Sequence, residues 1–401
     1  MNSVSETIQI ITERTAALPP EEVPLDLARR RVLAEHVTAP EDLPPFDRSA
    51  MDGYAVLRSD ASEWFAVVAE IRAGEMRQLQ MAPGQSIRIY TGAALPCDGL
   101  QVVMQESVEV AGNRIRLRRR SSDLHIRFRG EDVRQGAPLL PPGTILEAGE
   151  LALLASLGWM RPRVARLPQI AHFVTGDEIV APEAKPQPGQ IRDSNSTLLR
   201  ALLQEWGLTP HQGRLPEDAE AAWEDLQESP ARSADLLLIS GGASVGQHDH
   251  TRTLLERLGY TIHISKVNSR PGKPLLFGSQ SGRVAFGLPG NPVAHWVCFH
   301  LFVTTALRKA LGLPPEPERG SGLLAAPVPD CLSERETFWV ARASHCAGQV
   351  WLQPLRWQSS GDVTALAGAN ALLRIPPGTP ALPQNTPVEY VAAGAILQAP
   401  D

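Results

Sequence analysis

The stretch 234–251 constrains the fold most, because it joins an apolar run, a glycine-rich turn and the start of a helix. The apolar run at 236–239 shows no alternation, which favours a parallel strand that is covered on both faces. Gly241, Gly242 and Gly246 then allow the backbone to turn tightly and to come close to a ligand. The stretch therefore predicts a strand-to-helix turn in an α/β domain.

The same turn is typical of an anion-binding site. Backbone amides that converge at a helix N-terminus, with the Ser244 hydroxyl beside them, suit phosphate or another oxyanion. Asp249 or Thr251 is the expected cap of the helix that follows, and Gly259 ends it. The turn is neither a Walker loop nor the GxGxxG fingerprint of dinucleotide-binding proteins. A tight turn without a ligand stays open as the alternative.

Strands and helices alternate around this stretch, which predicts a doubly wound α/β domain with ligands at the carboxyl ends of its strands. The predicted strands are 169–174, 235–240, 260–267 and 283–287, and the predicted helices are 195–206, 217–228, 250–258 and 292–311.

A chain of 401 residues is too long for one ordinary core, so several domains are expected. Residues 1–40 and 134–168 are predicted to form an N-terminal helical and linker domain, and residues 41–133 an inserted β domain. The α/β domain would cover 169–313 and a small C-terminal β domain 320–401.

Three helices, at 3–16, 25–35 and 148–157, are expected in the N-terminal part. The first has Ser3 and Glu6 at capping-box spacing. If the three helices pack together, the β domain between them is an insertion.

Composition excludes some classes of protein. A net charge of −6 argues against general nucleic-acid binding. No apolar run reaches membrane-spanning length and no secretory leader is present, so a cytoplasmic location is the expectation. The cysteines are scattered and are expected to be reduced core thiols, not disulfides or zinc ligands: Cys97, Cys298, Cys331 and Cys346.

Carboxylates follow the predicted strands. Glu178 comes directly after the strand at 169–174, Asp249 ends the glycine-rich turn, and Asp52 lies in a proline-bracketed loop. Such carboxylates can hold a divalent ion, and helix capping is the simpler alternative for those next to helices. Zinc binding by His248, Asp249 and His250 is disfavoured, because consecutive residues rarely all point at one metal ion.

A basic cluster, Lys266, Arg270 and Lys273, surrounds a Pro-Gly turn and should project near the same sheet edge. Cations suit an oxyanion or phosphoester, and carboxylates suit Mg²⁺ that bridges phosphate oxygens. The residues therefore predict a protein that handles a phosphate-bearing small molecule with a divalent metal. No Ser-His-Asp order or nucleophile elbow competes with that interpretation.

Seven spaced motifs together resemble the molybdopterin molybdenumtransferases, namely MoeA and the E domain of gephyrin. The resemblance runs in order from about residue 5 to residue 311 and is weaker from there to residue 401. The motifs are 44–56 (PPFDRSAMDGYAV), 90–93, 129–132, 175–178, 240–246 with Asp249, 270–274 and 287–292.

The resemblance implies four domains, including a molybdopterin-binding α/β domain, and an elongated homodimer. Its site would lie between the α/β domain of one subunit and the N-terminal loop region of the other. It implies the reaction of adenylylated molybdopterin with molybdate, in the presence of Mg²⁺, to give molybdenum cofactor and AMP. A molybdopterin adenylyltransferase and cofactor-accepting molybdoenzymes are implied protein partners.

The resemblance also implies roles for individual residues. Asp52, Thr91, Asp132, Glu178 and Asp249 would belong to the metal and adenylyl-pterin site, with Asp52, Glu178 and Asp249 as metal ligands. Ser240, Gly241, Gly242, Ser244 and Gly246 would cradle phosphate. Lys266, Arg270 and Lys273 would hold molybdate or phosphate, and Pro289 and Pro292 would shape the pocket wall. Asp52, Asp249 and the three cations would be the catalytic groups.

Two positions depart from the family pattern. Arg270 stands where the family commonly has lysine, and Glu217 stands where it more often has aspartate. Arginine keeps the charge but changes its geometry, which leaves room for another oxyanion such as tungstate. A molybdopterin adenylyltransferase and a non-catalytic, gephyrin-like scaffold are the alternative functions. The presence of Asp52 and Asp249 argues against the scaffold.

Overall fold

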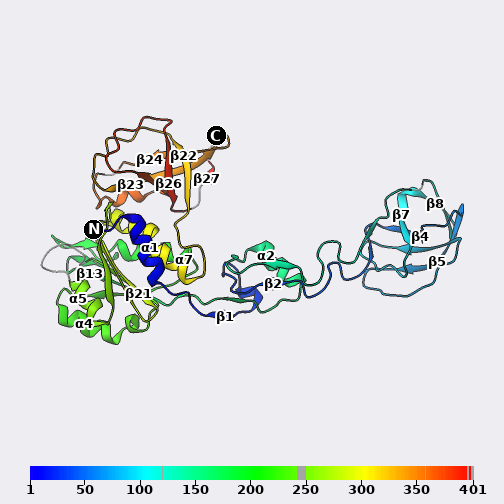
Figure 1. The fold of residues 1–401 in the computed structure, drawn as a ribbon, viewed down its shortest axis with the longest axis horizontal. Coiled ribbons are helices and arrows are strands. Elements are labelled where there is room, and N and C mark those ends of the chain that lie inside the picture. Colours follow the sequence, from blue (N-terminus) through cyan, green and yellow to red (C-terminus); the bar gives the residue numbers. More distant parts are fainter. Residues whose placement is uncertain (120, 242–249, 357, 395–396, 399–401) are drawn as a thin grey trace.

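The computed structural model describes residues 1–119, 121–241, 250–356, 358–394 and 397–398. The molecule is elongated (Figure 1). The α/β domain and the C-terminal β domain lie at one end, a narrow stalk lies in the middle, and the inserted β domain lies at the far end. The predicted fold class, a central doubly wound α/β domain with an N-terminal module, an inserted β domain and a C-terminal β domain, is confirmed.

The central sheet has six strands, of which four are parallel and two form an antiparallel edge. Every residue of its middle strand is buried, as the unbroken apolar run at 236–239 predicts. In spatial order the strands are β16 (His211–Leu215), β13 (Ile170–Thr175), β17 (Leu236–Ser240), β21 (Arg283–Leu288), β20 (Pro274–Gln280) and β18 (Thr261–Lys266).

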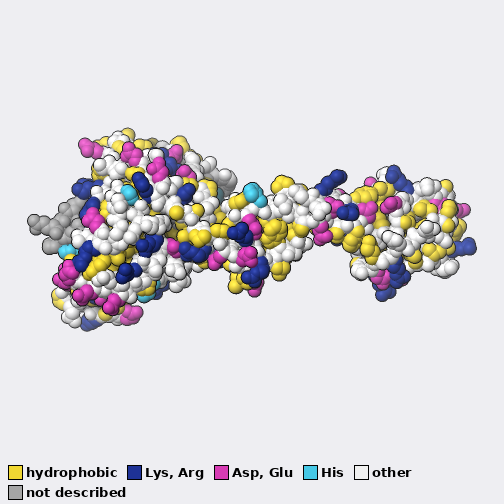
Figure 2. All heavy atoms as spheres, turned by 60° about the horizontal axis from the view of Figure 1, so that its bottom comes forward, with side chains coloured by type: hydrophobic (Ala, Val, Ile, Leu, Met, Phe, Trp, Pro, Cys, Tyr) yellow, Lys and Arg dark blue, Asp and Glu magenta, His cyan; other side chains and the backbone are white. Residues whose placement is uncertain are grey.

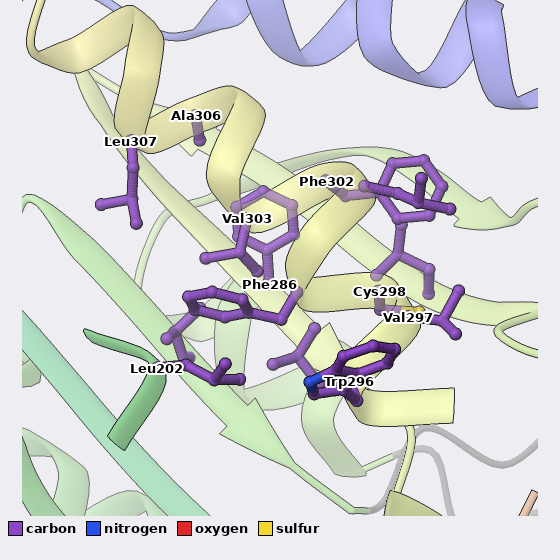
Figure 3. Close-up of a cluster of buried hydrophobic side chains, with 14 of the residues drawn as sticks. Leu202, Phe286, Trp296, Val297, Cys298, Phe302, Val303, Ala306 and Leu307 are labelled. Atoms are coloured by element: carbon purple, nitrogen blue, oxygen red, sulfur yellow. The ribbon is translucent and has the colours of Figure 1, made fainter. Parts of the chain in front are cut away.

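Helices cover both faces of this sheet. One face packs against α1 (Val4–Arg14), α3 (Asn195–Gln204) and the run from α6 (Pro292–Cys298) through the π-helical η4 (Phe299–Val303) to α7 (Thr304–Ala310). The other face packs against α4 (Ala219–Glu228) and α5 (His250–Arg257). Figure 3 shows side chains of the long helical run beside Phe286 and Leu202, which lie on β21 and α3.

The inserted domain and the C-terminal domain are each built around a β sheet. The inserted domain has six strands, in the order β7 (Leu100–Met104), β4 (Gly53–Leu57), β6 (Gln85–Ile89), β5 (Trp64–Ile71), β9 (Arg114–Leu117) and β8 (Val108–Ala111). The C-terminal sheet contains β22 (Arg319–Leu324), β23 (Glu336–Cys346), β24 (Gln349–Pro354), β25 (Ala371–Ile375), β26 (Pro387–Ala392) and β27 (Leu397–Gln398). It also takes in β19 (Ser269–Arg270), which comes from the α/β part of the chain and pairs with β23.

The stalk is built from two chain segments that run side by side. Two short antiparallel pairs tie them together, β1 (Pro20–Glu22) with β12 (Arg163–Ala165) and β2 (Val37–Thr38) with β11 (Pro138–Leu140). A third pair, β3 (Arg48–Ser49) with β10 (Ile126–Arg127), leads into the inserted domain.

The predicted helix at 25–35 is wrong. Only a short 3-10 turn forms, η1 (Leu25–Leu27), and the left-handed φ of 61° at Arg30 prevents a helix from continuing through 25–35. Val32 and Leu33 instead make single β bridges to Ile145 and Val164. These two apolar side chains are buried where the two segments of the stalk pair. The apolar pattern at 25–35 therefore reflects extended, paired backbone and not a helix.

The predicted packing of the three N-terminal helices together is also wrong. Helix α1, whose predicted capping box of Ser3 and Glu6 is confirmed, buries Val4, Ile8 and Ile11 in the core of the α/β domain. Helix α2 (Ala148–Ser156) packs separately in the stalk, against the segment that contains η1. The first helix is therefore part of the α/β domain, and the chain enters the stalk only after it.

The cysteines are free, but only Cys298 and Cys331 are buried, whereas Cys97 is half-buried and Cys346 is exposed. The expectation that all four are core thiols is wrong for Cys346. On the face drawn in Figure 2, acidic and basic side chains are interspersed along the molecule. Within the described residues, none of the helices has both the length and the apolar character needed to cross a membrane.

Candidate active site

An open pocket of about 720 Å³ lies at the carboxyl edge of the central sheet. The turns after β13, β17 and β21 all contribute to its wall, and the loop after β16 closes one side. Its size and its place at the ends of parallel strands are typical of a ligand site in a doubly wound domain. From the predicted set, the pocket brings together Glu178, Ser240, Gly241 and Pro289.

Two of the strand-end turns approach each other so closely that glycine is required. Gly241 has a φ of +91°, and a Cβ there would lie 2.7 Å from the carbonyl oxygen of Thr175. Its backbone N–H donates to the carbonyl of Leu288, which ties the end of β17 to the end of β21. Gly242, Ser244, Gly246 and Asp249 lie outside the described residues.

Carboxylates line the same pocket. Glu178 and Glu217 are among its lining residues, and Asp218 is engaged as the cap of α4 through a 2.9 Å bond from the Ala221 N–H. In the part of the chain that is described, no three His, Cys, Asp or Glu side chains gather closely enough to hold a metal ion by themselves. The carboxyl oxygens present are of the kind that Mg²⁺ prefers, with substrate oxygens as further ligands.

A second, more basic pocket of about 300 Å³ adjoins the first and shares Pro274, Pro289 and Asn291 with it. Arg270 and Lys273 line this pocket, whereas Lys266 and Pro292 do not. Lys266 lies on the exposed edge strand β18, and Pro292 is the first residue of α6.

The C-terminal domain supplies the other side of the basic pocket, which sequence reasoning missed. Arg335 lines it and donates to the carbonyl of Ser269 at 3.3 Å. Ser360 lines it too, and its hydroxyl accepts a 2.8 Å bond from Asn291 Nδ2. The pairing of β19 with β23 brings Arg335 to the α/β domain, and the Val293 N–H, which donates to the Ser360 carbonyl at 3.0 Å, helps to hold Ser360 there. Neither residue belongs to a motif that would have singled it out.

A hydrogen-bond chain that begins at the exposed Arg200 and ends in the interior supports the floor of the larger pocket. Arg200 donates to Gln212 Oε1 at 2.6 Å, which fixes the Gln212 amide nitrogen toward His172 Nδ1 at 3.1 Å. His172 therefore carries its hydrogen on Nε2 and donates it to Ser240 Oγ at 2.8 Å. Ser240 Oγ also lies 3.4 Å from Nδ1 of His295, which extends the chain to α6.

Both histidines of this chain are neutral at physiological pH. Burial is the main cause that lowers the pKa of His172 to about 3 and the pKa of His295 to about 4. The Ser240 side chain is fully buried between them. Its hydroxyl is thus held in the interior, and the ligand-facing part of this turn is the backbone.

Three predicted residues lie in the inserted domain and at its base. Asp52 Oδ1 accepts bonds from both the N–H and the Oγ1 of Thr91, each at 2.8 Å. These bonds, the backbone one first, hold the pKa of Asp52 below its usual range. Asp132 pairs with Arg127. Within one chain, the stalk separates these residues from the pockets of the α/β domain (Figure 1).

Three family models match the chain in order. Residues 2–158 match the MoeA N-terminal region (domain I and II), residues 171–309 the probable molybdopterin binding domain, and residues 332–392 the MoeA C-terminal region (domain IV). Together they leave only short connections unmatched.

Individual proteins agree with the family models. A molybdopterin molybdenumtransferase from Nostoc is 39% identical over 78% of this chain and 75% of its own length. Molybdopterin molybdenumtransferase 2 of Mycobacterium tuberculosis is 34% identical over 99% of each chain. A crystal structure of a molybdopterin biosynthesis MoeA protein from Pyrococcus horikoshii aligns with a TM-score of 0.82 at 28% identity and covers 98% of this chain and 100% of its own.

Proposed function

The chain belongs to the molybdopterin molybdenumtransferase (MoeA) family, and we propose that it inserts molybdenum from molybdate into adenylylated molybdopterin, with release of AMP. The family membership rests on the ordered family matches and on relatives that cover nearly the whole chain. The observation that carries the proposal is the pair of adjoining pockets, one with Gly241 and carboxylates and one with Arg270, Lys273 and Arg335.

The two pockets suit the two substrates. The larger pocket would take adenylyl-molybdopterin, with the backbone around Gly241 facing its phosphates. The smaller pocket would take the molybdate dianion, because its cations lower the cost of bringing a second anion to the site. The shared wall of Pro274, Pro289 and Asn291 keeps the two anions side by side.

In the proposed reaction, an oxygen of molybdate attacks the adenylyl phosphorus. The bond from that phosphorus to the molybdopterin phosphate breaks, AMP leaves with the attacking oxygen, and the metal passes to the dithiolene sulfurs. Lys273 and Arg270 would hold molybdate in line for this attack and Glu178 would orient the phosphates through a bound Mg²⁺. That ion would supply charge neutralisation at the pyrophosphate.

We further infer a composite site in a homodimer. Asp52, Thr91 and Asp132 sit beyond the stalk from their own α/β pockets, so a second copy of the chain is the natural source of these residues. A cytoplasmic location, delivery of substrate by a molybdopterin adenylyltransferase and transfer of the product to molybdoenzymes complete the proposal.

AMP release tests the proposed function. Purified protein is mixed with adenylyl-molybdopterin, molybdate and Mg²⁺, and wild type is compared with Asp52→Ala and Lys273→Ala. We expect molybdate-dependent AMP release that falls about 100-fold in each variant, as is usual when a transition-state electrostatic contact is lost. Arg114→Ala, which changes an exposed side chain on strand β9 of the inserted domain, is the matched control and should stay active. A wild type that binds the pterin but releases no AMP would contradict the proposal.

A further inference from the structure

A third pocket, of about 300 Å³, lies at the opposite edge of the central sheet from the candidate active site. It sits where β21 begins and β20 ends, and the ends of α4 and α5 and the turn η3 (Pro230–Arg232) enclose it. The first residue of β21, Arg283, lines it, whereas the last residue of that strand leads to Pro289 in the active-site wall. The two regions are therefore a whole strand apart.

Three arginines give this pocket a positive character. Arg257 stacks over the ring of Trp223 and is neutralised by two hydrogen bonds, of 2.7 and 3.1 Å, to Glu220. Arg283 donates only to uncharged groups, the Oε1 of Gln280 at 2.9 Å and a backbone carbonyl. Within the described ranges, neither Arg283 nor Arg232 has a carboxylate at ion-pair distance. Two guanidinium charges in the pocket are thus left without a counter-ion.

Tyr260 gives an independent sign of a ligand. Its side chain lines the pocket and is only 4% exposed, yet its hydroxyl has no hydrogen-bond partner among the described residues. Burial raises the pKa of this hydroxyl, so it stays protonated and can donate. The nearby Asp235 is already held by Arg166 through two bonds of 2.9 Å. Buried hydroxyls without partners are rare and destabilising.

We propose that this pocket binds a tetrahedral oxyanion of the phosphate type, whose oxygens accept hydrogen bonds from Arg283, Arg232 and Tyr260. Guanidinium groups bind such oxygens through paired N–H donors, and the tyrosine hydroxyl supplies a further donor. Free phosphate and the end group of a phosphomonoester share this chemistry. The site does not depend on the function proposed above, because it shares no residue with the two active-site pockets.

Calorimetric titration of the full-length chain tests the site. Inorganic phosphate and phenyl phosphate are titrated at constant ionic strength set with potassium chloride. All proteins carry Lys273→Ala, which weakens anion binding in the active-site region. We expect saturable binding of phosphate that weakens at least about tenfold in Tyr260→Phe and in Arg283→Gln, the size of a lost charge-assisted or buried hydrogen bond. Binding of phenyl phosphate alone would assign the site to a phosphomonoester.

The Tyr260→Phe change keeps the packing and removes only the unpartnered hydroxyl. Its melting temperature without anion should therefore equal or exceed that of the parent, while the stabilisation by phosphate is lost. Tyr390→Phe, at a buried tyrosine of the C-terminal sheet, is the matched control and should leave anion binding unchanged. Equal anion affinity in the parent, Tyr260→Phe and Arg283→Gln would overturn the proposal. So would a lower melting temperature of anion-free Tyr260→Phe, because the hydroxyl would then already have a partner.

Discussion

At the scale of single residues, the hydrogen bonds from Thr91 lower the pKa of Asp52. Because the pKa of Asp52 is lowered in the folded protein, its carboxylate contributes stability above its unfolded-state pKa and loses it as pH falls through the folded value. The same bonds extend the pH range over which the carboxylate stays ionised toward more acidic pH. Thr91 is thus a supporting residue whose loss should be visible as a pH effect.

Thr91→Val removes the hydroxyl bond to Asp52 and keeps the backbone bond. We expect the pKa of Asp52 to rise toward its ordinary value, so that the acid limb of kcat/KM for AMP release moves to higher pH. The measurement is a pH–rate profile, and Thr91→Ser, which retains the hydroxyl, should behave like wild type. An unchanged acid limb in Thr91→Val would contradict the prediction that the Thr91 hydroxyl lowers the pKa of Asp52.

The buried chain under the glycine turn allows a sharper test with two amides. In His172→Gln the amide nitrogen lies near the original Nε2 and can still donate to Ser240. In His172→Asn the shorter side chain can replace only Nδ1, so the bond to Ser240 is lost. We expect His172→Gln to keep kcat/KM for AMP release within about 3-fold, and His172→Asn to lose about 10-fold, the size of one buried hydrogen bond.

Unfolding by urea supplies the control for these two variants. Both remove a buried imidazole, so both should lose stability to a similar degree while differing in activity. If activity follows stability alone in the two proteins, the chain contributes only to folding and does not position the turn at Ser240 and Gly241.

At the scale of elements, α1 is a structural part of the α/β domain although the stalk separates them in sequence. Ile11 is fully buried there, together with Val4 and Ile8. Truncating a buried isoleucine to alanine removes apolar contacts and leaves a cavity, at a usual cost of about 2–5 kcal/mol.

Ile11→Ala should therefore reduce amide-exchange protection in β13 and β17 and leave the inserted domain unchanged. Ile71→Ala, a fully buried change in the inserted domain, is the matched control and should have the reverse pattern. If Ile11→Ala reduces protection in the stalk helix α2 and not in the central sheet, α1 packs with the N-terminal helices, as predicted from sequence.

Elements with a strong local signal were predictable from sequence. The apolar run before Gly241 identified β17, and the capping-box spacing of Ser3 and Glu6 identified the start of α1. Strand β16 was missed because its sequence, HQGRL, is mostly polar and pairs at the sheet edge through its backbone. Strand β20 was missed because it begins at a proline that follows a Pro-Gly turn.

The site was predictable only where a motif carried it. Gly241, Glu178 and the Arg270–Lys273 turn were found, and the structure places them at two adjoining pockets. Arg335 and Ser360 were missed because their place depends on contacts between distant parts of the chain, the pairing of β19 with β23 for Arg335 and the bonds to Asn291 and Val293 for Ser360. His172 and His295 were missed because a buried histidine in an apolar strand or helix resembles any core residue.

At the scale of the whole molecule, the stalk determines which groups can share a site. Its two chain segments are tied by short antiparallel pairs, so the inserted domain is held away from its own α/β domain (Figure 1). A stalk of paired strands fixes the separation better than a single flexible linker would. In a homodimer, the inserted domain of each copy could reach the α/β pockets of the other copy, which would give two equivalent composite sites.

Mixing two inactive variants tests that arrangement. Asp52→Ala damages the inserted-domain half of a site and Lys273→Ala the α/β half, so a mixed dimer would hold one doubly damaged site and one intact site. With equal amounts and free exchange of subunits, half of the dimers are mixed, and AMP release should recover to roughly a quarter of the wild-type rate. The matched control is Lys273→Ala with Arg335→Ala, which damages the same half in both chains and should restore nothing. If differently tagged chains exchange but no activity returns in the first mixture, each chain builds its site alone.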